Sequence, residues 1–320
     1  MERRHAVGVL LVVVSACAFG SGALFAKPVY GAGLDWLTLL AWRFAIGGAL
    51  AWAWLLVSAE RRAELRRTSA RVAAGAVALG IVYTVNSSTY FAALETVPAS
   101  LAALIVYIYP VLVAVLTLRI GQPLRGRRPW IALGVASIGA ALAVGGIDAA
   151  HVPPISGILL AIAAPIVYSG WIVMSARLGG ERRDRAGDGE TGASPAVAGA
   201  LMITTTAAVF WAISLASGHR VAPTDIPAAA WGGIIGVGVV STFIAIQTFY
   251  AGARRVGAAQ AALISTIEPV YTITLAAILF GEVLTAVQLV GAALILGAVM
   301  VAQSAASPGR DLPSLRMADE

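Results

Sequence analysis

The sequence has little of several residue types on which most protein chemistry depends. Among its 320 residues there are one cysteine, Cys17, and three histidines, and only 12% of the residues are charged. A single cysteine cannot form an internal disulfide or, by itself, a metal cluster. His5, His151 and His219 fall in terminal or loop positions, and no HExxH, paired-carboxylate or glycine-rich phosphate motif is present. These absences argue against a metal site, a cofactor and an enzyme activity.

Apolar residues, by contrast, are abundant and come in long blocks. They make up 59% of the chain, whereas soluble domains are about 45–50% apolar. A membrane-spanning helix needs about 20 mostly apolar residues, and little chain is left over for a soluble catalytic domain. The sequence therefore predicts an all-α polytopic membrane protein. Ten blocks qualify as spans: residues 7–26, 36–57, 72–93, 98–118, 129–147, 154–176, 195–216, 229–252, 257–280 and 285–303.

The basic residues give this count a direction. A formal net charge of +6 could suggest a nucleic-acid partner, but the placement of the bases argues otherwise. With ten spans, 19 of the 22 lysines and arginines fall on one side, Lys27 and Arg220 fall on the other, and Arg43 lies inside the second span. Lysine and arginine mark the cytoplasmic side of membrane proteins. We therefore expect both termini in the cytoplasm, a location in the inner membrane and a lipid bilayer as the surroundings.

The chain also repeats itself. A shift of 159 residues sets "TVPASLAALIVYIYPVLVAVL" (96–116) on "RVGAAQAALISTIEPVYTITL" (255–275), and a weaker echo, shifted by 150, sets Gly20 on Gly170. We expect two five-helix halves, residues 1–150 and 151–304, followed by a cytoplasmic tail, 305–320. Because five is odd, the second half would enter the membrane from the opposite side, as in the inverted repeats of secondary transporters.

These segments resemble a known family. The stretches "ETVPASLAALIVYIYPVLVAVL" and "RRVGAAQAALISTIEPVYTITLAAILFGEVLTAVQLVGAALILGAVMV" are similar to EamA-type carriers of the drug/metabolite transporter superfamily, as are "FGSGALFAK" in span one and "WRF" in span two. Gly281-Glu282 fits the pattern, whereas the first half has Gly121-Gln122 at the corresponding place. The resemblance implies ten spans in two inverted halves and export of small metabolites or drugs, with no particular substrate.

Two charged residues stand inside the predicted spans. Glu268 lies near the middle of span nine, and Arg43 lies about 10 Å from the start of span two on the outer side. A charge inside the bilayer is costly, so it usually faces a cavity or a partner. We expect Glu268 to serve substrate binding or coupling and Arg43 to have a structural or gating role.

Prolines next to Glu268 and at its repeat position predict broken helices. Pro269 removes one helical N–H and displaces the carbonyl of Ser265, and Pro110 of span four holds the mirrored place. Such breaks suit a midplane binding site. Any one of the polar or aromatic residues nearby would, taken alone, more often serve packing or helix–helix hydrogen bonding. The candidate lining of a substrate site comprises Glu268, Tyr83, Asn86, Tyr90, Tyr109, Trp171, Gln247, Tyr250, Ser265 and Tyr271.

These features favour a secondary transporter that exports a small molecule, amino-acid-like or cationic and amphipathic, by alternating access. Glu268 could exchange a proton for substrate, since burial disfavours its charged form, or bind a cationic amine directly. Two alternatives stay open: a membrane-embedded enzyme acting on lipid or isoprenoid, and a facilitative channel. The sequence does not decide between gradient coupling and facilitated diffusion, nor between a monomer and a homodimer.

Overall fold

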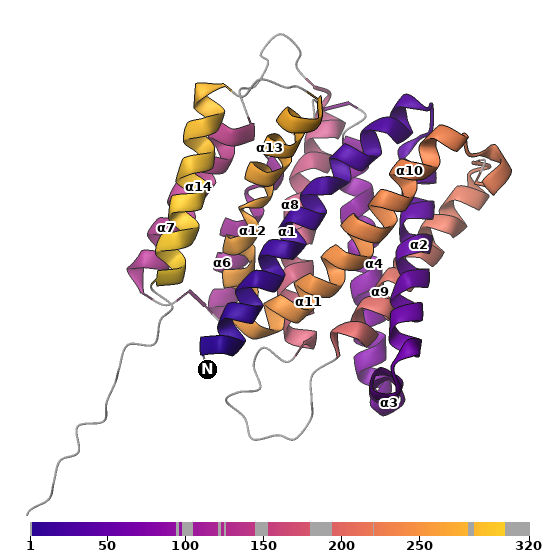
Figure 1. Cartoon of the computed structure of the whole chain (residues 1–320), viewed down its shortest axis with the longest axis horizontal. Coiled ribbons are helices and arrows are strands. Elements are labelled where there is room, and N and C mark those ends of the chain that lie inside the picture. The colour runs from indigo at the N-terminus through magenta and orange to yellow at the C-terminus, as the bar shows by residue number, and fades with distance from the viewer. Residues whose placement is uncertain are drawn as a thin grey trace, which may run out of the picture.

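A computed structural model of the chain describes residues 2–93, 96–97, 105–120, 123–124, 126–144, 153–179, 194–219, 221–280 and 285–304. Helices dominate these residues, none of which forms a strand, and the helices pack side by side as one bundle (Figure 1). The all-helical prediction is confirmed. Several features named from the sequence lie outside the described residues: the boundary at 150/151, the tail 305–320, Gly121-Gln122 and Gly281-Glu282.

The helices follow one another with short connections. They are α1 (Glu2–Gly31), α2 (Trp36–Val57), α3 (Ala59–Arg67), α4 (Ala70–Ala93), α6 (Tyr109–Ile120), α7 (Arg127–Val144), α8 (Ile155–Leu178), α9 (Pro195–Ala216), the 3₁₀ turn η1 (Pro223–Asp225), α10 (Ala228–Gly236), the π-helix η2 (Val237–Ile244), α11 (Ala245–Val256), α12 (Ala258–Ser265), α13 (Glu268–Phe280) and α14 (Ala286–Ser304).

Six helical stretches in the described part of the chain are long and apolar enough to cross a membrane. The remaining four predicted spans correspond to shorter helices, namely α6, α7, α12 with α13, and α14. The six long stretches are Arg3–Gly31, Trp36–Val57, Ala70–Ala93, Ile155–Leu178, Pro195–Ala216 and Ala228–Val256.

The helix that carries Glu268 is broken in mid-course. α12 ends at Ser265, two residues form a turn in which Ile267 N donates to Ile264 O at 3.2 Å, and α13 begins at Glu268. Pro269 is thus in the first turn of a new helix, where its missing N–H leaves no helical hydrogen bond unmade.

The same break occurs in the first half of the chain. Ile108 N donates to Ile105 O, again at 3.2 Å, and α6 begins at Tyr109 with Pro110 as its second residue. Each of these positions is 159 residues before its counterpart in α12 and α13. Two proline-led helices therefore start inside the bundle rather than at its surface.

Local chemistry explains several helix ends. Asp35 caps α2, because its Oδ1 accepts from the backbone N of Thr38 at 2.8 Å and its Oδ2 accepts from the Thr38 hydroxyl at 3.0 Å. Gly257 joins α11 to α12 in a single step with φ +86, a conformation that glycine adopts without strain.

Eight of the helices pack in pairs that are distant in sequence: α7 on α14, α2 on α9, α1 on α11, and α4 on α8. Figure 1 shows the α7 and α14 pair at one edge of the bundle. Glycines allow the close approaches. A Cβ at Gly139 of α7 would lie 2.8 Å from the Gly291 carbonyl of α14, and one at Gly252 of α11 would lie 2.9 Å from the Gly8 carbonyl of α1. Small residues of this kind mark helix interfaces in membranes.

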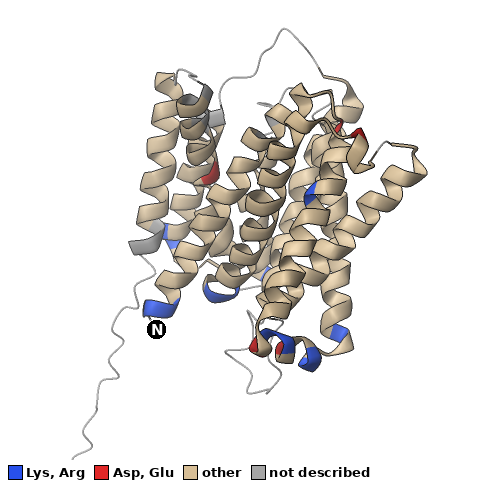
Figure 2. Ribbon diagram, turned by 45° about the vertical axis from the view of Figure 1, so that its right-hand side comes forward, with Lys and Arg blue, Asp and Glu red and all other residues tan. Residues whose placement is uncertain are grey.

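Basic residues gather at one end of the bundle (Figure 2). This end, called the arginine-rich end below, carries α3 and the last turns of α8 and α11, with Arg177, Arg254 and Arg255. The connection from α1 to α2, with Asp35, lies at the opposite end because α1 and α2 each cross the bundle once.

Candidate functional site

A cavity of about 540 Å³ lies among the helices. It is bounded by both halves of the chain and reaches toward the end opposite the arginine-rich end, where Tyr30 closes α1 and Leu39 opens α2. Its size falls within the range of small-molecule sites. The lining residues are Phe19, Gly20, Gly22, Ala26, Tyr30, Leu39, Arg43, Tyr83, Asn86, Ser87, Tyr90, Phe91, Val106, Tyr107, Tyr109, Ala164, Tyr168, Val237, Glu268 and Thr272.

Glu268 is the acidic residue of the cavity wall, and α1 fixes its position. Thr272, one turn later, donates its hydroxyl to the Gly20 carbonyl at 3.2 Å and to the Glu268 carbonyl at 3.0 Å. A Cβ at Gly20 would lie 2.5 Å from Thr272 Oγ1 and 3.3 Å from Glu268 Cγ, so a larger residue at position 20 would displace this turn. Within the described part of the chain, no salt bridge or hydrogen bond engages the Glu268 carboxylate. The carboxylate is available to a ligand in the cavity.

Arg43 is the basic residue of the wall, and it joins the two halves of the chain. Its Nε donates to Thr242 Oγ1 at 2.8 Å and its Nη2 donates to the Ser241 carbonyl at 3.1 Å. Its guanidinium carbon also lies 5.0 Å from the centre of the Phe44 ring, a cation–π distance. No carboxylate pairs with Arg43 among the described residues. The expected structural role therefore coexists with a place in the cavity wall.

The hydrogen bonds of Arg43 reach an irregular helix. η2 is a π-helix, in which the Thr242 hydroxyl donates to the Val237 carbonyl five residues back at 3.0 Å. Single π turns inside α-helices are frequent at functional sites. Here the wider turn presents the Ser241 carbonyl to Arg43 across the α2–η2 interface.

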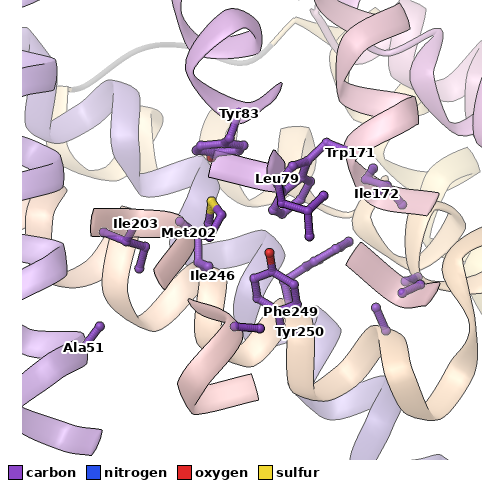
Figure 3. Packing of buried hydrophobic residues seen from close by; sticks show 14 of the residues in the cluster. Ala51, Leu79, Tyr83, Trp171, Ile172, Met202, Ile203, Ile246, Phe249 and Tyr250 are labelled. Atoms are coloured by element: carbon purple, nitrogen blue, oxygen red, sulfur yellow. The ribbon is translucent and has the colours of Figure 1, made fainter. Parts of the chain in front are cut away.

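Aromatic rings form the rest of the wall and continue behind it. Tyr109 packs edge-on against Tyr168 with ring centres 4.9 Å apart, and Tyr168 stacks on Trp171 at 5.7 Å. Tyr83 lies 4.9 Å from Trp171 as well, and Figure 3 shows these two rings in the buried layer. The cavity thus combines one carboxylate, one guanidinium and several rings.

The structure brings together half of the candidate binding residues named from the sequence. Glu268, Asn86, Tyr83, Tyr90 and Tyr109 line the cavity. Pro110 and Pro269 each follow the first residue of a helix that starts there. The candidates that do not line the cavity are Trp171, Gln247, Tyr250, Ser265 and Tyr271.

Those five residues lie in the packing around the cavity. Trp171, Tyr250, Gln247 and Ser265 are buried, and the Tyr271 hydroxyl lies 3.1 Å from the hydroxyl of Ser21 in α1. Helical spacing grouped Ser265 and Tyr271 with Glu268, but the break at 266–267 separates Ser265 from the helix that carries the other two.

Sequence reasoning missed the wall that α1 contributes. Gly20, Gly22, Phe19 and Tyr30 all line the cavity, as does Tyr107 of the turn before α6. A usable signal was the pair of glycines in "FGSGALFAK", because glycine spacing in a span permits close backbone approach. The described residues contain no group of three or more His, Cys, Asp or Glu side chains that could hold a metal ion.

Apolar membrane-length helices around a site with opposite charges define a polytopic membrane protein with a small-molecule cavity. Comparison with known proteins gives the particular family. The model of the EamA-like transporter family matches residues 6–145 and 155–303, so the chain belongs to that family and is a multi-pass membrane transporter. The resemblance noted in the sequence is confirmed.

One curated protein agrees with this assignment, and one solved structure has the same fold. The chain is 25% identical over 301 residues to "Uncharacterized transporter YcbK" of Bacillus subtilis (strain 168), covering 90% of each protein. A crystal structure superposes with a TM-score of 0.76 at 21% identity, over 94% of this chain and 98% of the other. At that identity the likeness supports the fold alone.

Proposed function

We propose that this transporter is a secondary carrier that exports a small amphipathic or zwitterionic molecule across the inner membrane by alternating access. The observation that carries the proposal is the unpaired Glu268 carboxylate in a cavity that also holds Arg43. Glu268 would bind a cationic amine, Arg43 would bind an anionic or carbonyl group, and the rings would hold the apolar part. A cavity of about 540 Å³ suits molecules from amino-acid size to drug size.

The carrier architecture is part of the proposal: ten spans in two inverted halves, 1–150 and 151–304, with both termini in the cytoplasm. Its support is the pattern of helix contacts. When each helix is replaced by its counterpart in the other half, the same set of contacting pairs is obtained. The pairing of α1 with α11 becomes that of α8 with α4, while α2–α9 and α7–α14 map onto themselves. An inverted duplication produces this pattern, because its two-fold axis lies in the membrane plane.

Individual glycine contacts support the same exchange. A Cβ at Gly8 would meet Val256 Cγ1 at 2.8 Å, and a Cβ at Gly157 would meet Val97 Cγ2 at 2.8 Å. Val97 and Val256 are related by the shift of 159, and Gly8 and Gly157 by 149, one less than the echo around Gly20 indicates. Matching contacts at matching depths favour two structurally equivalent halves.

Orientation decides what the cavity faces. If the arginine-rich end is cytoplasmic, as the excess of bases there favours, the cavity reaches toward the outer side. Export then requires a second state that opens at the arginine-rich end. Glu268 would release or take up a proton as its surroundings alternate between wet and dry, which gives a route to coupling with the proton gradient.

Reconstituted protein tests the function. Proteoliposomes would be loaded with a mixed panel of zwitterionic and cationic amphipathic metabolites and assayed for exchange with and without a pH gradient. Wild type and Glu268→Gln would run in parallel, with Glu60→Gln on the exposed surface of α3 as the matched control. We expect Glu268→Gln to lose at least tenfold in rate and Glu60→Gln to transport normally. Wild-type rates in Glu268→Gln at every pH would refute the role of the carboxylate.

A further inference from the structure

The two halves of the chain correspond in sequence, but the cavity extends toward only one end of the bundle. Particular residues explain this difference between the two ends. The shift of 159 sets "TYFA" (89–92) on "TFYA" (248–251), so Tyr90 and Phe91 correspond to Phe249 and Tyr250. The shift of 149 taken from the glycine contacts sets Gly22 on Trp171. A glycine in one half therefore corresponds to a tryptophan in the other.

The two sets of residues have opposite surroundings. Gly22, Tyr90 and Phe91 line the cavity toward the end opposite the arginine-rich end. At the arginine-rich end, Trp171 fills the corresponding space: its ring stacks on Phe249 at 5.3 Å and meets Tyr250 edge-on at 5.9 Å. Figure 3 shows Trp171, Phe249 and Tyr250 packed in one layer.

Polar atoms in this layer, and in Gln247 three residues before Tyr250 on α11, have no hydrogen-bond partner among the described residues. They are Trp171 Nε1, Tyr250 Oη and both side-chain polar atoms of Gln247. Gln247 is only 7% exposed and shares a face of α11 with Tyr250 three residues later. Buried polar groups are nearly always satisfied in proteins, so a cluster of unsatisfied ones needs an explanation.

The Gln247 side chain also occupies the space next to Gly199, which has no side chain of its own. A Cβ at Gly199 of α9 would lie 2.5 Å from Gln247 Nε2 and 2.8 Å from its Oε1. The amide is thus pressed against a glycine rather than turned toward a polar partner. Opening of the layer would free these atoms to bind water or a polar ligand.

We propose that Trp171 plugs a second vestibule, a space at the arginine-rich end that is closed in this structure. Gln247 and Tyr250 form the polar wall of this vestibule. It receives the hydrogen-bonding part of the transported molecule when Trp171 withdraws. The inference rests on the proposed carrier function and deepens it, because it names the residues that the substrate meets on the side closed in this structure. Gln247 supplies a donor and an acceptor, and Tyr250 a hydroxyl, which suits amide, carbonyl or hydroxyl groups of a neutral or zwitterionic substrate.

Cysteine labelling tests the plug without any knowledge of the substrate. Cys17 is the one cysteine of the chain, so Cys17→Ser gives a cysteine-free background. Asn86→Cys would report the cavity, Gln247→Cys the second vestibule, and Glu60→Cys on α3 would mark the arginine-rich side. Each single-cysteine protein would be treated, in sealed vesicles, with a membrane-impermeant maleimide from one side and then from the other.

We expect Asn86→Cys to react from the side opposite Glu60→Cys, and Gln247→Cys to react slowly and only from the side of Glu60→Cys. Adding Trp171→Ala should raise the rate at position 247 at least tenfold. Phe210→Ala is the matched control, because Phe210 is an equally buried ring that stacks on Phe44 at 5.5 Å outside the layer, and it should leave the rate unchanged.

Three results would overturn the inference: reaction of Gln247→Cys from the opposite side, equal rates with Trp171→Ala and Phe210→Ala, or no labelling at position 247 in a protein that transports. If Trp171→Ala is not monodisperse in detergent, Trp171→Leu takes its place. The side from which Gln247→Cys reacts when Trp171 is native also tests, without either variant, at which end the vestibule opens. The labelling needs no transport. A protein that transports but never labels at 247 refutes the plug alone, whereas one that labels as expected but moves no solute refutes the carrier function.

Discussion

Gly20 allows a quantitative test of how α1 holds the Glu268 turn. A Cβ at position 20 would lie 2.5 Å from Thr272 Oγ1 and 3.3 Å from both Cγ and the carbonyl oxygen of Glu268. The same close approach carries the hydrogen bond from the Thr272 hydroxyl to the Gly20 carbonyl at 3.2 Å. Gly20→Ala should therefore push α1 away from the first turn of α13 and displace the carboxylate.

The expected cost follows from three contributions. Overpacking by one methyl group costs about 1–3 kcal/mol, and weakening one hydrogen bond adds about 1 kcal/mol. Alanine in place of glycine within a helix offsets about 1 kcal/mol. The net destabilisation is about 1–3 kcal/mol. Gly170→Ala in α8 is the matched control, because a Cβ there meets nothing within 4 Å and only the helix gain of about 1 kcal/mol applies.

The assay is the apparent Tm of the two purified variants and wild type in one detergent at one scan rate. Since 1 kcal/mol moves Tm by about 2–4 °C in domains of 150–250 residues, the two variants should differ by on the order of 10 °C, with Gly20→Ala the lower. Transport by Gly20→Ala should fall as well, because Glu268 moves. Equal apparent Tm values for the two variants would refute the reasoning about this contact.

Three further substitutions follow from single contacts. Arg43→Leu removes the hydrogen bonds to Thr242 and to the Ser241 carbonyl, so the apparent Tm should fall by the equivalent of about 2–3 kcal/mol. An unchanged Tm would show that these hydrogen bonds do not stabilise the packing of α2 on η2. Gly139→Leu would place a Cβ 2.8 Å from the α14 backbone and lower the Tm, whereas Gly134→Leu on the same helix meets nothing within 4 Å and should not. Gly22→Trp should fill the cavity and slow maleimide labelling of a cysteine at position 86 at least tenfold, and unchanged labelling would contradict the correspondence with the plug.

Helix positions were predictable where a hydrophobic block ends at a residue that also ends a helix. The second and seventh spans were expected at 36–57 and 195–216, and α2 and α9 have these bounds. The reason is local: Asp35 caps α2 and Pro195 opens α9. α1 was expected at 7–26 but runs Glu2–Gly31. At its start the exposed Arg3 and Arg4 extend the helix into water, and at its end Val29 is buried in a second apolar cluster.

The cavity wall was predictable only for side chains that carry chemistry. Glu268 and Asn86 are conspicuous in an apolar span, whereas Gly20 and Gly22 contribute by lacking a side chain, and hydropathy does not register that. The periodicity of the sequence also could not show that Trp171 is packed into a closed layer rather than exposed to the cavity. In either case the aromatic residue would lie on the inward face of its helix.

The π-helix was beyond sequence reasoning for a different reason. A Cβ at Gly80 would face the Met202 carbonyl, and a Cβ at Gly238 would face the Arg43 carbonyl. Gly80 and Gly238 are 158 residues apart, whereas the shift is 159 from the "TYFA" segment onward. If the halves are repeats, as proposed above, the second half has one additional residue between these points, and the wider turn of η2 would accommodate it. Only the contacts before and after the insertion reveal it.

The proposed transport cycle needs some corresponding residues of the two halves to differ in their surroundings and others to share the same cavity. In the proposed two-fold arrangement, Glu268 and its counterpart Tyr109 both line the cavity, which would place them next to the proposed axis between the halves. Gly22 and Trp171 correspond as well, but only Gly22 lines it. A residue near the axis stays accessible whichever side opens, so a single carboxylate can serve both states. A second one in place of Tyr109 would add the cost of another charge within the bilayer and repel the first.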